Sequence, residues 1–302
     1  MASASSRRVA LTLGDARGIG PEIVRKALAD PRILALDVRW WIVGPTGTEV
    51  APDDVVGVWM PTGHAESDAA LAGRLAGLAV ERAAQMALAG DVSAVVTAPL
   101  DKAALYAGGY DFPGHTEMLA AIAGVPTTMM LASDRLRVVL ATTHLALRDV
   151  PAAVTHDAIV HAADRTRAGL IRGFGIVSPR IALCAMNPHA GDHGRFGDED
   201  DRILAPAALE AGIAGPFPAD TVFVRAMRGE FDAVIAPYHD VGMTAIKVAS
   251  FGGAVNVTLG LPFPRTSPDH GTALDIAGQG IASPESLIAA MILAVRLAHL
   301  AR

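Results

Sequence analysis

Three histidines stand at the ends of three strand-like segments, each just before a polar turn. They are His144 in VVLATTHLALRD, His189 in IALCAMNPHAGD and His239 in DAVIAPYHDVG. The carboxyl ends of parallel strands meet at one edge of a sheet, where ligands usually bind, so we expect the three side chains to share a site. Neutral imidazole is the commonest metal ligand, and three of them leave coordination positions open for a substrate. The sequence therefore predicts an open metal site.

The elements that must position these histidines follow an alternating pattern. Strand-like runs such as RRVALTLGD, VRWWIVG, VSAVVTAP and RIALCAMNP are separated by helix-like segments such as GPEIVRKALAD and HDAIVHAADRTRAGLI. This alternation predicts an α/β fold with a largely parallel sheet and helices on both faces. No internal repeat or low-complexity linker divides the chain.

Composition excludes several classes of function. Among 302 residues, 25 Lys and Arg stand against 31 Asp and Glu, so no global basic surface suggests nucleic-acid binding. The single Cys184 allows no disulfide framework and predicts a reducing, cytoplasmic location. We interpret it as a buried structural residue of its strand rather than a catalytic thiol.

The mean hydropathy of +0.36 does not indicate a membrane protein. The longest apolar segment, SLIAAMILAVRLAHLAR, contains Arg296 and is too short to span a bilayer, so we expect a packed C-terminal helix. The opening MASASSRR lacks the apolar core of a signal peptide, and we expect an unstructured leader.

Several polar residues could bind a small anion. His115 and Thr116 follow a Pro-Gly turn and open a helical pattern, where Thr116 could either cap the helix or contact a ligand. Lys247, Asn256 and Arg265 add two cations and an amide within apolar strands and Gly-rich turns, and Arg offers forked recognition of carboxylate or phosphate.

The loop after His189 is rich in Gly, His and acidic residues. We expect His193, further along this loop, to be exposed rather than a ligand. The acidic run from Asp198 to Asp201 is typical of the first turn of a following helix. The Gly-rich turn near the N-terminus, LGDARGIG, does not have the spacing of the dinucleotide fingerprint.

Motifs over nearly the whole chain resemble the 4-hydroxythreonine-4-phosphate dehydrogenase family of vitamin B6 biosynthesis. The matching blocks, in order, are GIGPE, TAPLDKA, GHTE, LATTHLALRDVP, NPHAG, GPFPADTVF, YHDVG, VNVTLGLPFPRTS and DHGTALDIAGQG. The last block is also similar to the adenosine-binding loop of the isopropylmalate and isocitrate dehydrogenases. The resemblance implies their fold: two α/β/α lobes around a cleft, in a homodimer with the active site at the subunit interface.

The resemblance also assigns lobes and residues. Residues 1–110 with 272–302 would form the cofactor lobe, and residues 111–271 the lobe with the metal, the substrate and the dimer interface. One divalent metal per subunit (zinc, magnesium, cobalt or manganese) would be held by His144, His189 and His239. Substrate would bind to His115, Thr116, Lys247, Asn256 and Arg265. His270 and Asp275 would contact the cofactor, and Asp240, Lys102 and Asp269 are candidates for the proton acceptor.

The implied reaction is the NAD(P)-dependent oxidation of 4-phosphooxy-L-threonine to a 3-keto acid, which decarboxylates to 3-amino-2-oxopropyl phosphate. A carboxylate such as Asp275 beside the ribose favours NAD over NADP, although the family uses either. This chain departs from the family at Val241, at Ala16 and Arg17, at Pro264 and Pro268, and in a shortened region around residues 30–64. These differences leave open a four-carbon sugar-acid phosphate, D-threonate or D-erythronate 4-phosphate, as the substrate.

Two other classes remain as alternatives. A zinc hydrolase could use three histidines to activate water, although the sequence has no H-E-x-x-H motif. A non-catalytic protein could bind a phosphorylated metabolite with the same residues.

Overall fold

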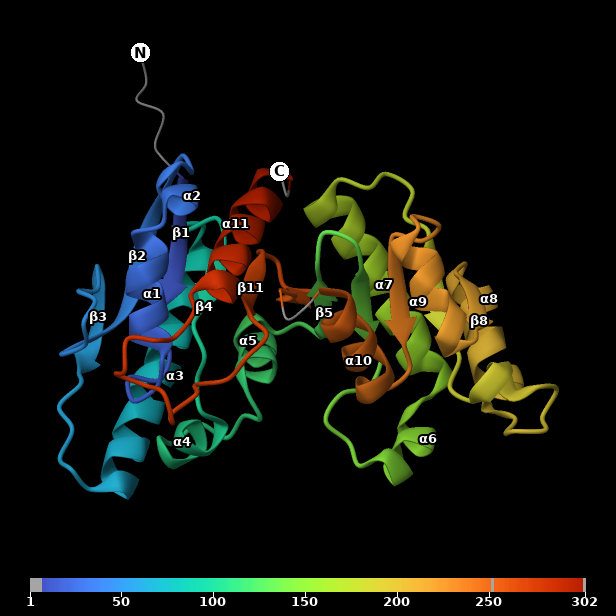
Figure 1. The fold of residues 1–302 in the computed structure, drawn as a ribbon, viewed down its shortest axis with the longest axis horizontal. Coiled ribbons are helices and arrows are strands. Elements are labelled where there is room, and N and C mark those ends of the chain that lie inside the picture. The colour runs from blue at the N-terminus through green and yellow to red at the C-terminus, as the bar shows by residue number, and fades with distance from the viewer. Residues whose placement is uncertain (1–6, 251–252, 301–302) are drawn as a thin grey trace, which may run out of the picture. The chain divides into compact units, whose positions relative to one another are not determined.

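The computed structural model describes residues 7–250 and 253–300, and its chain forms two compact units (Figure 1). The first unit comprises Met1–Thr127 with Leu261–Arg302, and the second comprises Thr128–Gly260. Residues 1–6, in the expected leader, lie outside the described residues. The α/β class expected from the alternating pattern is confirmed in both units.

The division between the units differs from the lobe borders expected at 110/111 and 271/272. Residues 111–127 belong to the first unit because Met118 and Leu119 pack into its core. Residues 261–271 belong there because Arg265 and Thr266 pair in parallel with the strand that ends at Thr97. His115, Thr116, Asp269 and His270 therefore lie in the first unit, as does Arg265.

The first unit is built on a parallel sheet with the strand order β3-β2-β1-β4-β11. The strands are β1 (Arg7–Thr12), β2 (Val38–Thr46), β3 (Asp54–Val58), β4 (Val95–Thr97) and β11 (Arg265–Pro268). Thr12 and Thr97 are register partners at the carboxyl ends of β1 and β4, so both strands deliver their following loops to one edge of the sheet.

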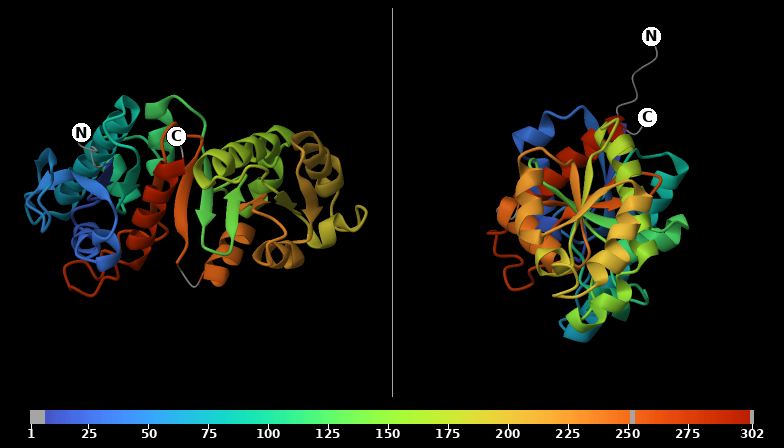
Figure 2. Two further views of the ribbon diagram at one scale, coloured as in Figure 1. Left: turned by 90° about the horizontal axis from the view of Figure 1, so that it is seen from above. Right: turned by 90° about the vertical axis from the view of Figure 1, so that its right-hand side faces the viewer.

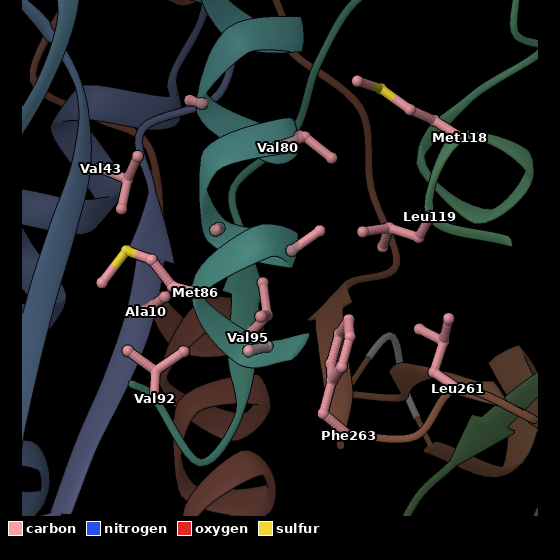
Figure 3. Close-up of a cluster of buried hydrophobic side chains, with 14 residues drawn as sticks. Ala10, Val43, Val80, Met86, Val92, Val95, Met118, Leu119, Leu261 and Phe263 are labelled. Atoms are coloured by element: carbon pink, nitrogen blue, oxygen red, sulfur yellow. The ribbon is translucent and has the colours of Figure 1, made fainter. Parts of the chain in front are cut away.

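The described residues of this unit form the helices α1 (Gly20–Leu28), α2 (Pro31–Leu34), α3 (Ala65–Ala89), α4 (Lys102–Ala107), α5 (His115–Ala123) and α11 (Glu285–Leu300). The long helix α3 lies between the strands and α5, with Met86 directed toward the sheet and Val80 toward Met118 and Leu119 (Figure 3). These side chains, with Phe263, form one apolar core. No helix in the part of the chain that the structure describes is long and apolar enough to cross a membrane.

The second unit has a mixed sheet with the strand order β10-β5-β6-β9-β7-β8. Its strands are β5 (Thr128–Ala132), β6 (Arg137–Leu140), β7 (Ile181–Cys184), β8 (Ala214–Phe217), β9 (Ala233–Ala236) and β10 (Val255–Leu259). The pairs β6-β9, β9-β7 and β7-β8 are parallel, whereas β10-β5 and β5-β6 are antiparallel. The three strands that precede His144, His239 and His189, namely β6, β9 and β7, are therefore adjacent and parallel.

Helices cover both faces of this second sheet: α7 (His156–Phe174) lies on one face, and α9 (Ala219–Met227) and α10 (His239–Ser250) lie on the other (Figure 2). Alternate strand residues such as Val138, Ala182 and Val234 form a core with residues of α9 and α10. Short helical segments complete the unit: η1 (Leu147–Asp149), α6 (Val150–Ala153), η2 (Pro188–Gly191), η3 (Asp200–Leu204) and α8 (Ala205–Ala211).

Cys184 has the structural role expected from the sequence. It ends β7, is fully buried, and belongs to the core beneath α9 and α10. Burial raises the pKa of its thiol to about 12, so the reactive thiolate is not populated at neutral pH.

Gly73 permits the close packing of α3 on α4, and its replacement should destabilise the first unit. A Cβ atom at Gly73 would lie 1.8 Å from the carbonyl oxygen of Ala104, so one of the two backbones would have to move. We expect Gly73→Ala to lower the free energy of unfolding by roughly 1–3 kcal/mol, as overpacked sites do. Chemical denaturation measures this change. The exposed Gln85→Ala on the same helix should change stability by less than about 0.5 kcal/mol. Equal stability of the two variants would contradict the packing argument.

Candidate functional site

The second unit brings two of the three predicted metal ligands together. His144 follows β6 and His239 follows β9, and because these strands are parallel neighbours, their ring centroids lie 5.5 Å apart. A cavity of about 70 Å³ opens between them, lined also by Thr143, Leu145 and Tyr238 among others. This volume suits an ion with its water ligands rather than a whole substrate.

Asp240 orients the ring of His239. Its carboxylate oxygen Oδ1 lies 2.7 Å from Nδ1 of His239, so the carboxylate accepts the Nδ1 proton and leaves the Nε2 lone pair available. Metal-binding histidines are commonly held in this way by a carboxylate. Asp240, a candidate proton acceptor in the sequence, therefore has a second possible task, which is to position a ligand.

His189 lies on the loop after β7, the strand adjacent to β9, but the structure does not gather it into a metal-binding group with the other two. Its side chain is exposed, and its ring centroid lies 6.3 Å from that of Phe196. Within residues 7–250 and 253–300, no three His, Cys, Asp or Glu side chains are close enough to hold a metal ion. The donor chemistry of His144 and His239 fits a divalent metal, while the third ligand is not in place.

Asp200 and Glu199 hold the loop before His189. The sequence pattern assigns both residues only to the first turn of a following helix. Asp200 is 1% exposed, and its carboxylate accepts hydrogen bonds from the backbone N–H groups of Met186 at 2.8 Å and Asn187 at 3.0 Å. Glu199 accepts a further bond from the Asn187 side chain at 2.8 Å. The acidic run does begin the helical segment η3, as expected. Its buried residue Asp200, however, forms its hydrogen bonds with the loop that precedes His189. In the sequence, this role was indicated only by the position of the acidic run shortly after NPHAG.

The loop that carries His189 is strained. His189, Ala190, Asp192 and His193 all have positive φ values, between 44° and 56°. This left-handed conformation costs about 1 kcal/mol or more for each residue with a side chain. Such strain accumulates at binding sites, where the surrounding bonds maintain it. His193 is exposed, as expected.

The first unit contains a cluster of basic groups, which we call the basic cluster: Arg265, His115 and Lys102. Arg265 in β11 is only 1% exposed, and its Nη2 donates a hydrogen bond to Thr97 Oγ1 at 2.6 Å. Burial lowers the pKa of the Arg265 guanidinium to about 10, and the nearby Glu117 carboxylate partly opposes this effect. A buried cation of this kind favours the approach of an anion.

His115 is the neutral member of the basic cluster. It begins α5, and its Nε2 atom is buried with no hydrogen-bond partner among the described residues. Burial lowers the pKa of His115 well below its ordinary value, and the positive charges of Arg265 and Lys102 lower it further. An unpartnered buried ring nitrogen beside two cations has the chemistry of a ligand contact.

Thr116 does not cap its helix. Gly114 occupies the N-cap position and makes no side-chain capping bond, while Thr116 lies in the first turn of α5. The capping interpretation of Thr116 is therefore wrong, because the helix begins at His115, two residues earlier than that role requires. The backbone N–H groups of this first turn, next to the basic cluster, favour an anion.

The remaining predicted residues are distributed over both units. Lys247 is exposed near the end of α10, and Asn256 lies in β10 with its Oδ1 atom buried, both in the second unit. Asp269 and His270 follow β11 and are half-buried, and the Asp275 side chain is exposed on the loop before α11. The structure thus supplies a surface-accessible loop at the position expected for the cofactor.

Two departures from the family pattern have structural roles. Arg17 donates hydrogen bonds to both carboxylate oxygens of the buried Asp15, at 3.1 and 2.7 Å, and it lies 3.7 Å from Asp101. Val241 packs as a partly buried residue against the core of the second unit. Arg17 therefore pairs with the buried Asp15 and approaches Asp101, whereas Val241 contributes apolar contact in the first turn of α10, close to His239.

Comparison with known proteins now identifies the family. Residues 44–294 match the family described as pyridoxal phosphate biosynthetic protein PdxA. The chain belongs to this PdxA family. A 4-hydroxythreonine-4-phosphate dehydrogenase of Paracoccus denitrificans is 43% identical, with 97% of each chain covered. A protein of Bradyrhizobium diazoefficiens named "Putative D-threonate 4-phosphate dehydrogenase" is 42% identical, again with 97% of each chain covered.

Solved structures agree with this assignment. The crystal structure of 4-hydroxythreonine-4-phosphate dehydrogenase from Klebsiella pneumoniae has a TM-score of 0.85 to this chain at 37% identity, covering 98% of this chain and 99% of that one. The family and its relatives indicate that the protein is a dehydrogenase of the oxidoreductase class, which confirms the expected family and fold. They do not support the hydrolase alternative. A dehydrogenase of this family implies a nicotinamide cofactor and a divalent metal.

The buried His115 should make the stability of the protein depend on pH. Below its ordinary pKa of 6.5 the ring binds a proton in the unfolded chain but not in the folded protein, so the free energy of unfolding falls as the pH falls through this range. We expect His115→Gln to reduce this slope, and urea denaturation at pH 7.5 and about 5.5 measures it. The exposed His64→Gln should retain the wild-type slope. An unchanged slope in His115→Gln would contradict the assigned burial.

Proposed function

We propose that the protein is a 4-hydroxythreonine-4-phosphate dehydrogenase of vitamin B6 biosynthesis. It oxidises 4-phosphooxy-L-threonine with NAD(P) to the 3-keto acid, which loses CO₂ to give 3-amino-2-oxopropyl phosphate. The observation that carries this proposal is the basic cluster, where the buried Arg265 and the unpartnered Nε2 of His115 lie beside Lys102. The relatives at about 40% identity support the same substrate.

The basic cluster would bind the phosphate of the substrate. The forked guanidinium of Arg265 matches two phosphate oxygens, while Lys102 contributes a point charge. His115 donates from its buried ring nitrogen, and an incoming phosphate raises its pKa because the negative charge favours imidazolium. Thr116, Lys247 and Asn256 complete the proposed substrate contacts. Binding at the phosphate anchors the substrate and orients its reacting carbon.

The second unit would hold a divalent metal with His144 and His239, the residues whose donor set fits one, and with His189 as the third ligand. When bound, such a metal acts as a Lewis acid toward the substrate hydroxyl. Asp240 keeps the His239 ring oriented for this role. A bound nicotinamide would accept the hydride from the substrate carbon, and the hydroxyl proton would pass to a base, for which Asp240, Lys102 and Asp269 are the candidates.

The cofactor would bind to the loop that carries His270 and Asp275. The exposed Asp275 carboxylate suits the ribose hydroxyls of NAD and disfavours the 2′-phosphate of NADP. A cytoplasmic homodimer, in which the partner subunit completes the active site, belongs to the same proposal.

A second candidate substrate is D-threonate 4-phosphate or D-erythronate 4-phosphate. The similarity to the Bradyrhizobium diazoefficiens protein supports this possibility. Each candidate carries a terminal phosphate and a secondary hydroxyl, so the basic cluster and the histidines would serve all three.

A reduction assay with NAD and NADP should distinguish these substrates. With a divalent metal present, we expect 4-phosphooxy-L-threonine to give the highest kcat/KM. Arg265→Lys should raise the substrate KM about tenfold or more, which corresponds to ~1.4 kcal/mol, because forked recognition is lost. The affinity for NAD should not change, and the exposed Arg296→Lys serves as the control. Higher kcat/KM with a sugar-acid phosphate would instead establish the second candidate.

Metal binding should depend on the paired histidines. We expect His144→Ala and His239→Ala to weaken Co²⁺ binding by at least tenfold, as measured by calorimetry or by the visible absorbance of bound Co²⁺. His189→Ala should weaken Co²⁺ binding as well, because His189 is the proposed third ligand. The exposed His193→Ala on the same loop should bind Co²⁺ like the wild type. Wild-type affinity in His239→Ala would refute the proposed metal site.

A further inference from the structure

Helix α1 holds one end of the proposed cofactor loop through a partly buried ion pair between Glu22 and Lys26. Glu22, in the first turn of α1, is 3% exposed, and its Oε1 accepts hydrogen bonds from Lys26 Nζ at 2.7 Å and from the Ala282 backbone N–H at 3.0 Å. Lys26 Nζ also donates to the carbonyl oxygens of Gly280 at 2.9 Å and Ala282 at 2.7 Å. All three donors of the ammonium group are thus used, two of them on the loop.

The same helix start holds the other end of this loop. The backbone N–H of Ile19 donates to the carbonyl oxygen of Thr272 at 2.9 Å. At Gly18 a Cβ atom would lie 2.7 Å from that same carbonyl oxygen, so only glycine permits this approach. Residues 18–26 therefore fix residues 272 and 280–282, and the chain between these points runs from β11 to α11 beside α1 (Figure 1).

Between these two attachments the loop has little support of its own. Its residues are mostly exposed, and its internal bonds are short-range, from the Ile276 N–H to the Ala273 carbonyl at 3.1 Å and from the Gln279 N–H to the Ile276 carbonyl at 3.2 Å. Ala273 has a left-handed φ of 43°, which is costly for a residue with a side chain. A loop with this geometry needs external attachments to offset the conformational entropy lost on ordering it, about 1–2 kcal/mol per residue.

We propose that Glu22 and Lys26 are positioning residues that keep the loop at residues 272–282 in the conformation that binds the nicotinamide dinucleotide. Neither side chain touches the cofactor in this proposal. Their effect is to order the loop around Asp275 before the cofactor binds, so that binding does not lose the conformational entropy of the loop. The inference rests on the proposed function, in which this loop receives the cofactor.

Charge makes the two residues interdependent. Glu22 is buried, and the hydrogen bond from Lys26 lowers the pKa of its carboxyl group. Removal of either partner leaves an uncompensated charge next to the loop backbone, whereas a neutral isostere at Glu22 keeps an oxygen acceptor for the Ala282 N–H. Lys26→Met should therefore disturb the loop more than Glu22→Gln does.

The test uses the whole chain. Its first step is to measure NAD binding to the wild type by fluorescence or calorimetry. If the wild type binds no dinucleotide, the proposed function fails, and the positioning proposal fails with it. If it binds, Lys26→Met and Glu22→Gln are compared with Arg25→Gln, a neighbour whose partner is the surface residue Glu49.

We expect Lys26→Met to raise the Kd and KM for NAD about tenfold, and Glu22→Gln to raise them less. The KM for the phosphorylated substrate and kcat at saturating NAD should stay at wild-type values, and Arg25→Gln should behave as the wild type. Amide hydrogen exchange should accelerate selectively in residues 273–282, with the Ala282 amide as the direct reporter. If Lys26→Met does not fold, Glu22→Gln carries the same comparison.

Two results would overturn the positioning proposal while leaving the proposed function intact. The first is unchanged exchange in residues 273–282 in both variants, which would show that the ion pair does not order the loop. The second is faster exchange with unchanged NAD affinity, which would show that order in this loop does not govern cofactor binding. A rise in the substrate KM equal to the rise for NAD would also count against it, because a general loss of structure would explain both.

Discussion

The parallel, adjacent course of β6, β9 and β7 is the constraint on which the proposed chemistry of the second unit depends. Because neighbouring parallel strands end at one edge, segments almost a hundred residues apart in the chain emerge side by side. His144 and His239 become close neighbours through this arrangement, with ring centroids 5.5 Å apart. A sheet with antiparallel order at these strands would send alternate loops to opposite edges.

Two functional groups of the first unit, Arg265 and His115, are buried at a cost in free energy. Arg265 is buried with its pKa lowered, and His115 remains neutral with a buried nitrogen that has no partner among the described residues. Both features are unfavourable for the folded protein by themselves. In the proposed substrate complex a phosphate would offset these positive charges and give the buried Nε2 of His115 a partner.

Buried carboxylates hold the loops at both candidate sites. Asp200 accepts two backbone N–H groups ahead of His189, and Glu22 accepts the N–H of Ala282 at the end of the loop that precedes α11. In each case the carboxylate lies far from the loop in sequence or on a different element. Charged acceptors form stronger hydrogen bonds to N–H groups than neutral ones do, so one buried side chain can order a segment that lacks regular structure.

The sequence by itself determined the α/β class, the strand ends with their histidines, the structural role of Cys184 and the family, because these depend on local periodicity and on short motifs. Only the tertiary structure decided which groups meet. It divided the chain into compact units at 127/128 and 260/261, placed His144 beside His239 without His189, and excluded Thr116 as a cap. It also joined Glu22 to Ala282 across 260 residues of chain. Desolvation and long-range hydrogen bonds arise only when distant segments pack together, and no local pattern of residues records them.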